Sequence, residues 1–392
     1  MEGGTDMRTP QSHADRLRNR VAAGDTGLIA DEVLRMLASN RGHWQRGWDK
    51  VLDQLRALPA DRRAALRRAL ADRHPARQGE NTGNTGNTGN TGNTDDAGSA
   101  GSADNADDMD GIDLRCGALV VRTYLSEGLP ADPREDACLA ADRRAALDGL
   151  GRRRAFHPAA RFELLAEAEL AAGRALSAPV VAAFRRTARE AEYEDAQPLI
   201  RLADRLTDPV LDVGEAWADR ALRDTAASAA PAAWQALLAH AATATASRPT
   251  ARWDTRARAL LAPLDPGLVR ATVLDWLALV GRPRTLLLRR HPHEPDIDAT
   301  YDPHNATALR GLAWLLSLLP AHPDTARALG RLAETSLVPV PGHGPRGPKV
   351  ANAAVLALSR LPGDPGRTEL DRLAARVTYR STARLIAAAI AR

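Results

Sequence analysis

Aromatic residues, cysteine and lysine are scarce in this chain of 392 residues. Phe, Trp and Tyr together make up 4% of the sequence, so stacking platforms for single-stranded bases are few. The two cysteines, Cys116 and Cys138, allow at most one disulfide, and both lie in segments of apolar periodicity where we expect buried thiols. Only Lys50 and Lys349 are lysines among 53 basic residues. Such a preference for arginine is typical of a GC-rich genome, so the net charge of +4 is weak evidence for nucleic-acid binding.

Long apolar runs and known catalytic patterns are also missing from the sequence. No apolar run approaches the roughly 18 residues of a membrane span, and the first twenty residues, MEGGTDMRTPQSHADRLRNR, are polar throughout. We therefore expect no membrane association and a cytoplasmic location. The GxSxG, CxxC and HExxH patterns do not occur, so the sequence predicts no catalytic residue and no cofactor. Enzymatic activity stays open, and a non-enzymatic role is favoured.

The segment from residue 77 to 111 divides the chain. It contains NTGNTGNTGNTGNT followed by a run rich in Asp, Ser and Gly, and it has almost no apolar side chains to offset the entropy of ordering. The sequence predicts a disordered, acidic, low-complexity linker here. Residues 1–76 before it have helical apolar spacing and predict a small helical module. Within that module, Trp44 and Trp48 are four residues apart and are expected on one helix face, as core packing or, alternatively, as a partner-binding anchor.

Residues 112–392 contain one helical pattern after another without a convincing strand. In the segment around GLVRATVLDWLALVG, Asp265 is expected to cap a helix whose apolar stripe precedes Gly281. In NATALRGLAWLLSLLP, Asn305 is expected to cap a second helix, with a stripe at Leu309, Leu312, Ala313 and Leu316. The other five tryptophans are expected in the core: Trp217, Trp234, Trp253, Trp276 and Trp314. Arginine runs at 152–154 and 289–290 indicate solvated faces, with phosphate contacts as the alternative.

Two of these helical units are similar to each other. LLPAHPDTARALGRLAE aligns with RLPGDPGRTELDRLAAR at an offset of about 42 residues, which is within the period of about 40 to 47 of HEAT and armadillo units. A helix pair of that length cannot bury its own apolar face, so it must stack on its neighbours. The sequence therefore predicts an all-α fold: a HEAT/armadillo-like α-solenoid of helix pairs over 112–392, preceded by the linker and the N-terminal module.

Residues 212–392 resemble a bacterial group in four phrases: LLAHAATATASRPTARWDTRARALL, LVGRPRT, HNATALRGLAWLLSLL and VPVPGHGPRGPKVANAAVLALSRLPG. The chain is similar there to the helical-repeat region of the large molybdate-metabolism-regulator-like proteins, which often carry a WGR domain and a C-terminal domain of unknown function. The resemblance implies a HEAT-like fold and no established activity for this region. Because the large members continue beyond the point that corresponds to Arg392, we expect any activity of their C-terminal domain to be absent here.

The phrase VPVPGHGPRGPKV has three glycines at the spacing of a phosphate-cradling loop. A dinucleotide site needs a strand before the glycines, whereas TARALGRLAETSL predicts a helix, and Val350 stands where a Walker loop needs a hydroxyl. We therefore favour a loop between two helices. The alternative is an anion or partner contact formed by His343, Arg346 and Lys349 near the start of the helix PKVANAAVLALSRL.

The segment RRHPHEPDIDATYDPHN has ligand types suited to zinc or manganese, with His291, His293 and His304 as candidates. No helical spacing fixes these histidines relative to one another. A polar loop in which Asp302 and Asn305 cap helices is the favoured interpretation.

Together these features favour a non-enzymatic helical-repeat scaffold or interaction protein that binds a macromolecular partner, most directly a protein, on a curved surface. The alternative hypothesis is a nucleic-acid-binding HEAT-like protein linked to DNA processing. The basic charge supports that alternative, while the arginine bias and the few aromatic residues weaken it.

Overall fold

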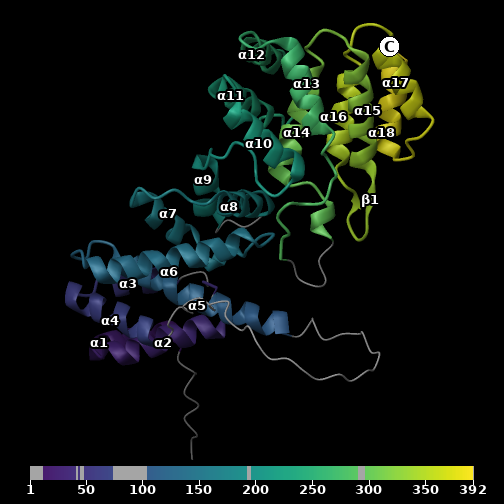
Figure 1. Ribbon diagram of the computed structural model, residues 1–392. Helices are drawn as coiled ribbons and strands as arrows, with labels where there is room; N and C mark the ends of the chain where they lie inside the picture. Colours follow the sequence, from purple (N-terminus) through teal and green to yellow (C-terminus); the bar gives the residue numbers. More distant parts are fainter. Residues whose placement is uncertain are drawn as a thin grey trace, which may run out of the picture. The chain divides into compact units, whose positions relative to one another are not determined.

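The computed structural model describes residues 12–40, 43–44, 48–73, 104–191, 196–289 and 296–391. Regular structure in these ranges is almost entirely helical (Figure 1), which confirms the prediction of a mainly helical chain. The first nine helices are α1 (His13–Ala23), α2 (Thr26–Ser39), α3 (Asp49–Arg56), α4 (Ala60–Arg73), α5 (Asp104–Ser126), α6 (Pro133–Gly151), α7 (Glu163–Ala171), α8 (Ala178–Glu190) and α9 (Gln197–Arg205). The other nine are α10 (Ala216–Ala227), α11 (Pro231–Ala241), α12 (Ala251–Leu261), α13 (Pro266–Leu277), α14 (Pro303–Leu316), α15 (Pro323–Leu337), α16 (Pro348–Leu358), α17 (Asp364–Ala374) and α18 (Arg380–Ile390). Shorter elements are the 3₁₀ turns η1 (Pro158–Ala160) and η3 (Ile297–Ala299) and the strands β1 (Pro339–Val340) and β2 (Gly344–Pro345).

The chain forms two compact units. Of the described residues, the N-terminal unit comprises those between 12 and 147, 157–176 and 196–199, and the C-terminal unit comprises 148–156, 177–191, 200–289 and 296–391. This division differs from the one expected from the linker, because α5, α7 and most of α6 belong with α1–α4. Helix α5 begins at Asp104, within the last part of the segment predicted as a linker, while residues 77–103 of that segment lie outside the described residues.

In the N-terminal unit, α2 and α4 both pack on α5. Trp44 and Trp48 are buried, and their rings meet edge to face with centroids 5.4 Å apart, so they contribute to the core. They do not share a helix face as expected, because Trp48 caps the start of α3 and Trp44 precedes that helix. The expectation for the cysteines is confirmed for Cys116, which is buried, and is wrong for Cys138, which is exposed on α6 next to the buried Leu139.

Eight helices of the C-terminal unit, α10, α11 and α13 to α18, follow two rows by their contacts. In one row α10 contacts α13, α13 contacts α15, and α15 contacts α17. In the other row α11 contacts α14, α14 contacts α16, and α16 contacts α18. Partners from the two rows also contact each other directly, as α15 does with α16 and α17 with α18 (Figure 1). The two segments that align with each other in sequence form α15 and α17, neighbours in the first row.

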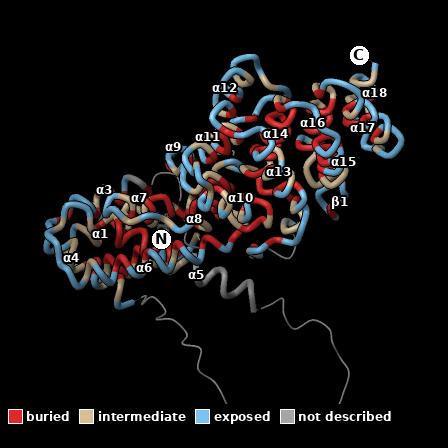
Figure 2. The backbone as a smooth tube through the Cα atoms, turned by 45° about the horizontal axis from the view of Figure 1, so that its top comes forward, coloured by how far each residue is buried: buried red, intermediate tan, exposed pale blue. Residues whose placement is uncertain are grey.

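A hydrophobic core cluster runs through these rows, and Figure 2 shows buried residues along α14 and α16. Helix α13 follows its sequence pattern: the Asp265 carboxylate accepts a hydrogen bond from the Leu268 backbone N–H, the predicted stripe is buried, and Gly281 has a positive φ of 82° beyond the helix. The stripe predicted for α14 is buried as well. Of the five tryptophans expected in the core, four are buried and Trp253 is half-buried against them.

Two local expectations are wrong. Asp302 rather than Asn305 caps α14, because the helix begins at Pro303 and the Asp302 carboxylate accepts from the His304 N–H. Asn305 is instead fully buried inside the unit. In the arginine run 152–154, Arg152 is exposed but Arg153 is buried, since this segment pairs through its backbone with Arg289. Within the described ranges, no helix combines the length and the apolar character needed to cross a membrane.

Candidate functional site

The glycine-rich phrase is a tight hairpin between α15 and α16. Strands β1 and β2 pair antiparallel, and Gly342 and Gly344 have φ values of 73° and 92°, a left-handed conformation that glycine adopts without strain. Position 347 requires glycine because of limited space, since a Cβ atom there would lie 2.6 Å from the Tyr301 ring. The glycines thus serve a turn and a close approach, and the segment connects two helices as expected.

The three residues of the proposed anion contact lie in different surroundings. His343 lies exposed in the hairpin turn. Arg346 donates from its Nε to the Ala299 carbonyl at 2.7 Å and lines one cavity, whereas Lys349 lines another. The structure therefore does not bring His343, Arg346 and Lys349 together.

The candidate metal ligands are only partly described. His291 and His293 lie outside the described residues. At His304, Nε2 donates to the Val210 carbonyl at 3.0 Å and Nδ1 lies 3.3 Å from Arg189 Nη2, so both ring nitrogens have protein partners. Burial lowers the pKa of His304 to about 4. Across the described ranges, no group of three or more His, Cys, Asp and Glu side chains is arranged to hold a metal ion.

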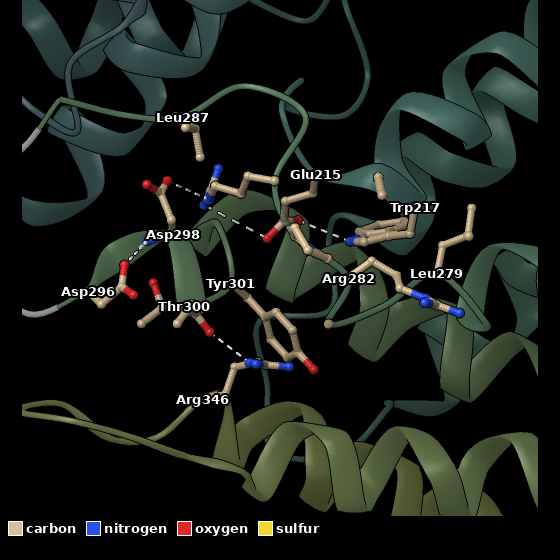
Figure 3. Close-up of a pocket in the computed structure, with 15 residues that line it drawn as sticks. Glu215, Trp217, Leu279, Arg282, Leu287, Asp296, Asp298, Thr300, Tyr301 and Arg346 are labelled. Atoms are coloured by element: carbon tan, nitrogen blue, oxygen red, sulfur yellow. Dashed lines mark hydrogen bonds and ion pairs between the residues drawn. The ribbon is translucent and has the colours of Figure 1, made fainter.

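Arg346 lines a cavity of about 300 Å³ that we call the Arg284 cavity. Figure 3 shows its carboxylates Asp296 and Asp298 on one side and Trp217 and Arg282 on the other. The Arg346 guanidinium lies 5.9 Å from the centre of the Tyr301 ring. The charged residues of the lining balance in number: Arg282, Arg284 and Arg346 against Glu215, Asp296 and Asp298.

Arg284 is the most deeply buried of these charges. Its side chain is 2% exposed and lies between two carboxylates, with Nη2 at 3.9 Å from Glu215 and Nε at 3.6 Å from Asp298. None of its three guanidinium nitrogens has a hydrogen-bond partner. The carboxylates therefore balance the charge of Arg284 without making hydrogen bonds to it.

Glu215 continues from the cavity into a buried polar network. It accepts hydrogen bonds from the Asp302 backbone N–H at 2.8 Å, from Asn305 Nδ2 at 2.9 Å and from Trp217 Nε1 at 3.0 Å. Burial raises the pKa of Glu215, although the nearby charge of Arg284 opposes this shift. Asn305 thus holds the start of α14 to the segment before α10, which explains its burial.

Two further ion pairs complete the network. Arg185 Nη1 lies 2.7 Å from Asp212 Oδ1, and Arg186 Nη1 lies 3.1 Å from Asp302 Oδ2. Burial raises the pKa of Asp212 well above its usual value. Burial also opposes ionisation of Asp302, but the charge of Arg186 and the hydrogen bonds of Asp302 outweigh it, so its pKa lies below the usual value. Every charged member of this network has a partner of opposite charge inside the unit, as expected of a structural element.

A second cavity, which we call the Arg310 cavity, has a volume of about 410 Å³ and lies in the same unit. Its lining has three cations, Arg248, Arg310 and Lys349, and no carboxylate. Its neutral polar residues are Thr245, Ser247, Asn352 and Ser381. Leu356 and Leu385 complete the lining. The two cavities thus differ in their charge balance, although both contain three cations.

A local sequence pattern pointed to Lys349, whereas none pointed to Arg284 or Arg310. Arg310 stands between Leu309 and Gly311 in an otherwise apolar helix, and an arginine at such a position is the feature that could have marked it. Arg284 follows a proline in a loop and carries no such pattern.

No protein-family model, no curated protein and no solved structure matches the chain.

Proposed function

We propose that this chain is a HEAT-like helical-repeat scaffold that binds a macromolecular partner and carries out no reaction itself. The main support for this proposal is the two-row order of helices in the C-terminal unit. Each helix contacts the equivalent helix of the next pair, α13 with α15 and α14 with α16, as in stacked repeats. The similarity of residues 212–392 to the repeat region of molybdate-metabolism-regulator-like proteins belongs to the same proposal, as does a cytoplasmic location.

A stack of helix pairs suits binding better than catalysis. Such a stack shields its apolar faces between neighbouring pairs and leaves a long row of helix surfaces exposed. The buried ion pairs Arg185–Asp212 and Arg186–Asp302 join α8 and α14 to the loop before α10, which supports a rigid surface. A protein partner is the first expectation, because protein interfaces use arginine together with exposed apolar anchors, and Leu287 is 69% exposed at the Arg284 cavity.

Affinity capture of the tagged full chain from its native host, followed by mass spectrometry, tests this proposal. We expect specific proteins to remain bound after nuclease treatment. A Leu287→Ser variant reports on the Arg284 cavity, and Val338→Ser, which changes an apolar side chain that is 43% exposed outside the cavity lining, is its matched control.

Loss of all captured material after nuclease, with affinity for duplex DNA that falls steeply with salt, would instead establish the nucleic-acid hypothesis. Turnover of a substrate by the purified chain would refute the scaffold.

A further inference from the structure

The cations of the Arg310 cavity lack acidic partners. Neither Arg248, Arg310 nor Lys349 forms an ion pair with any residue that the structure describes. By contrast, Arg360 in the same unit pairs with Asp254 at 2.6 Å. The cavity therefore collects three positive charges that the described residues leave uncompensated.

Arg310 is the most informative of the three because it is buried. It is 8% exposed, and its Nε has no hydrogen-bond partner. Its Nη2 donates to the Ala246 carbonyl, and its guanidinium lies 5.8 Å from the Trp314 ring centre, so its head is held in place at the cavity. Burial lowers its pKa. Burial of a guanidinium without an anionic partner leaves its desolvation uncompensated, so the arrangement calls for an external anion.

Two helix starts add further donors. Lys349 belongs to the first turn of α16, Asn352 lies on the next turn of that helix, and Ser381 belongs to the first turn of α18. Neither helix has a side-chain cap. In α16 the Val350 and Ala351 N–H groups bond to the Gly347 carbonyl, so among the described residues the Lys349 N–H of that turn and the Ser381 N–H of α18 stay available as donors. The Asn352 Oδ1 accepts a hydrogen bond from Thr382 at 2.7 Å, which leaves the amide N–H groups of Asn352 as donors.

From this arrangement we propose that the Arg310 cavity binds a phosphate monoester dianion. Three cations and several neutral donors match a group with two negative charges and at least three acceptor oxygens better than they match a single carboxylate. The cations converge on one cavity instead of forming a row, which favours one phosphate group over the backbone of a duplex. Small phosphate compounds and phosphorylated side chains share this chemistry.

Titration calorimetry on the full chain tests the proposal with inorganic phosphate and with one short peptide in phosphoserine, serine and glutamate forms. We expect saturable binding of phosphate and of the phosphoserine peptide. The double variant Arg248→Gln/Lys349→Gln changes two exposed residues and should weaken that binding by about tenfold or more. The matched control Arg258→Gln/Arg331→Gln removes the same charge from exposed positions outside the cavity and should stay within about twofold of the unchanged chain.

A second measurement follows the thermal stability of the chain instead of the heat of binding. Phosphate should raise the melting temperature of the unchanged chain more than chloride at equal ionic strength, and the double variant should lose that difference. Tighter binding of the phosphoserine peptide than of inorganic phosphate would identify a phosphorylated protein as the source, and equal binding would identify a small phosphate compound.

Absence of saturable phosphate binding would overturn the proposal. So would equal affinity for the glutamate peptide, or an equal loss of affinity in the control. Binding of a duplex oligonucleotide that depends on Arg248 and Lys349, without binding of either phosphate probe, would assign the cavity to nucleic acid instead.

Discussion

Two cavities of the C-terminal unit, the Arg284 cavity and the Arg310 cavity, contain the same number of cations and differ in what neutralises them. In the Arg284 cavity, Glu215, Asp296 and Asp298 balance the three arginines, and a buried ionic network lies beneath. In the Arg310 cavity no carboxylate is present. Nearly every basic residue of the chain is arginine, so the number of arginines in a cavity says little about ligand binding. The ion pairs of each arginine are more informative, because an arginine paired with a carboxylate has a structural role and an unpaired one can bind a ligand.

Breaking the network beneath the Arg284 cavity should have the largest effect. Asp302→Asn keeps a side-chain oxygen for the cap of α14 but removes the charge opposite Arg186, whose side chain is 1% exposed. We expect a loss of about 3 to 5 kcal/mol in the free energy of unfolding, measured by denaturant titration. The control is Asp324→Asn, which breaks an exposed pair with Arg327 and should cost less than about 1 kcal/mol. Equal losses in the two variants would contradict a structural role for the network.

Replacing each central arginine by methionine compares the cavities directly. Arg284→Met leaves Glu215 and Asp298 without their cation and should destabilise the chain by about 3 kcal/mol. Arg310→Met removes a buried charge that has no acidic partner, so without phosphate the free energy of unfolding should stay within about 1 kcal/mol of the unchanged chain. Both values come from denaturant titration in phosphate-free buffer. A larger loss for Arg310→Met than for Arg284→Met would reverse the comparison.

Acid should lower the free energy of unfolding through protonation of His304. Burial lowers its pKa from 6.5 to about 4, so the unfolded chain binds the proton more tightly than the folded one. The free energy of unfolding should therefore be unaffected by His304 above about pH 7 and should fall by up to about 3 kcal/mol between about pH 6.5 and pH 4. The His304→Gln variant should lose this part of the pH dependence in denaturant titrations at each pH. An unchanged slope in the variant would show that other groups cause it.

The exposed cations of the Arg310 cavity should contribute least to folding. Arg248→Gln and Lys349→Gln, each alone and without phosphate, should change the free energy of unfolding by less than about 0.5 kcal/mol, because neither residue is paired or buried. Thermal melts in phosphate-free buffer provide the measurement. A substantial loss would mean that these residues support the fold rather than a ligand.

Much of the helical structure could be predicted from local sequence patterns. The cap at Asp265 and the stripes of α13 and α14 follow from short-range rules, as does the helix α15 before the glycine phrase. The burial of Asn305 could not be predicted, because its partners Asp212 and Glu215 lie 93 and 90 residues away in the chain.

The composition of the two cavities likewise depends on contacts between residues that are far apart in the sequence. Lys349 was a candidate from its place near a helix start, but its neighbours Arg248 and Arg310 come from different segments that only the tertiary fold brings together. Arg346 was grouped with Lys349 because the two are close in sequence, yet they line different cavities.

The unequal exposure of the two cysteines has a practical consequence. A maleimide dye added to the native chain should attach at Cys138 alone, since Cys116 is enclosed by the N-terminal unit. The unchanged chain can therefore be labelled with one fluorophore per molecule. The rate at which the Cys116 thiol then reacts measures how fast the N-terminal unit opens.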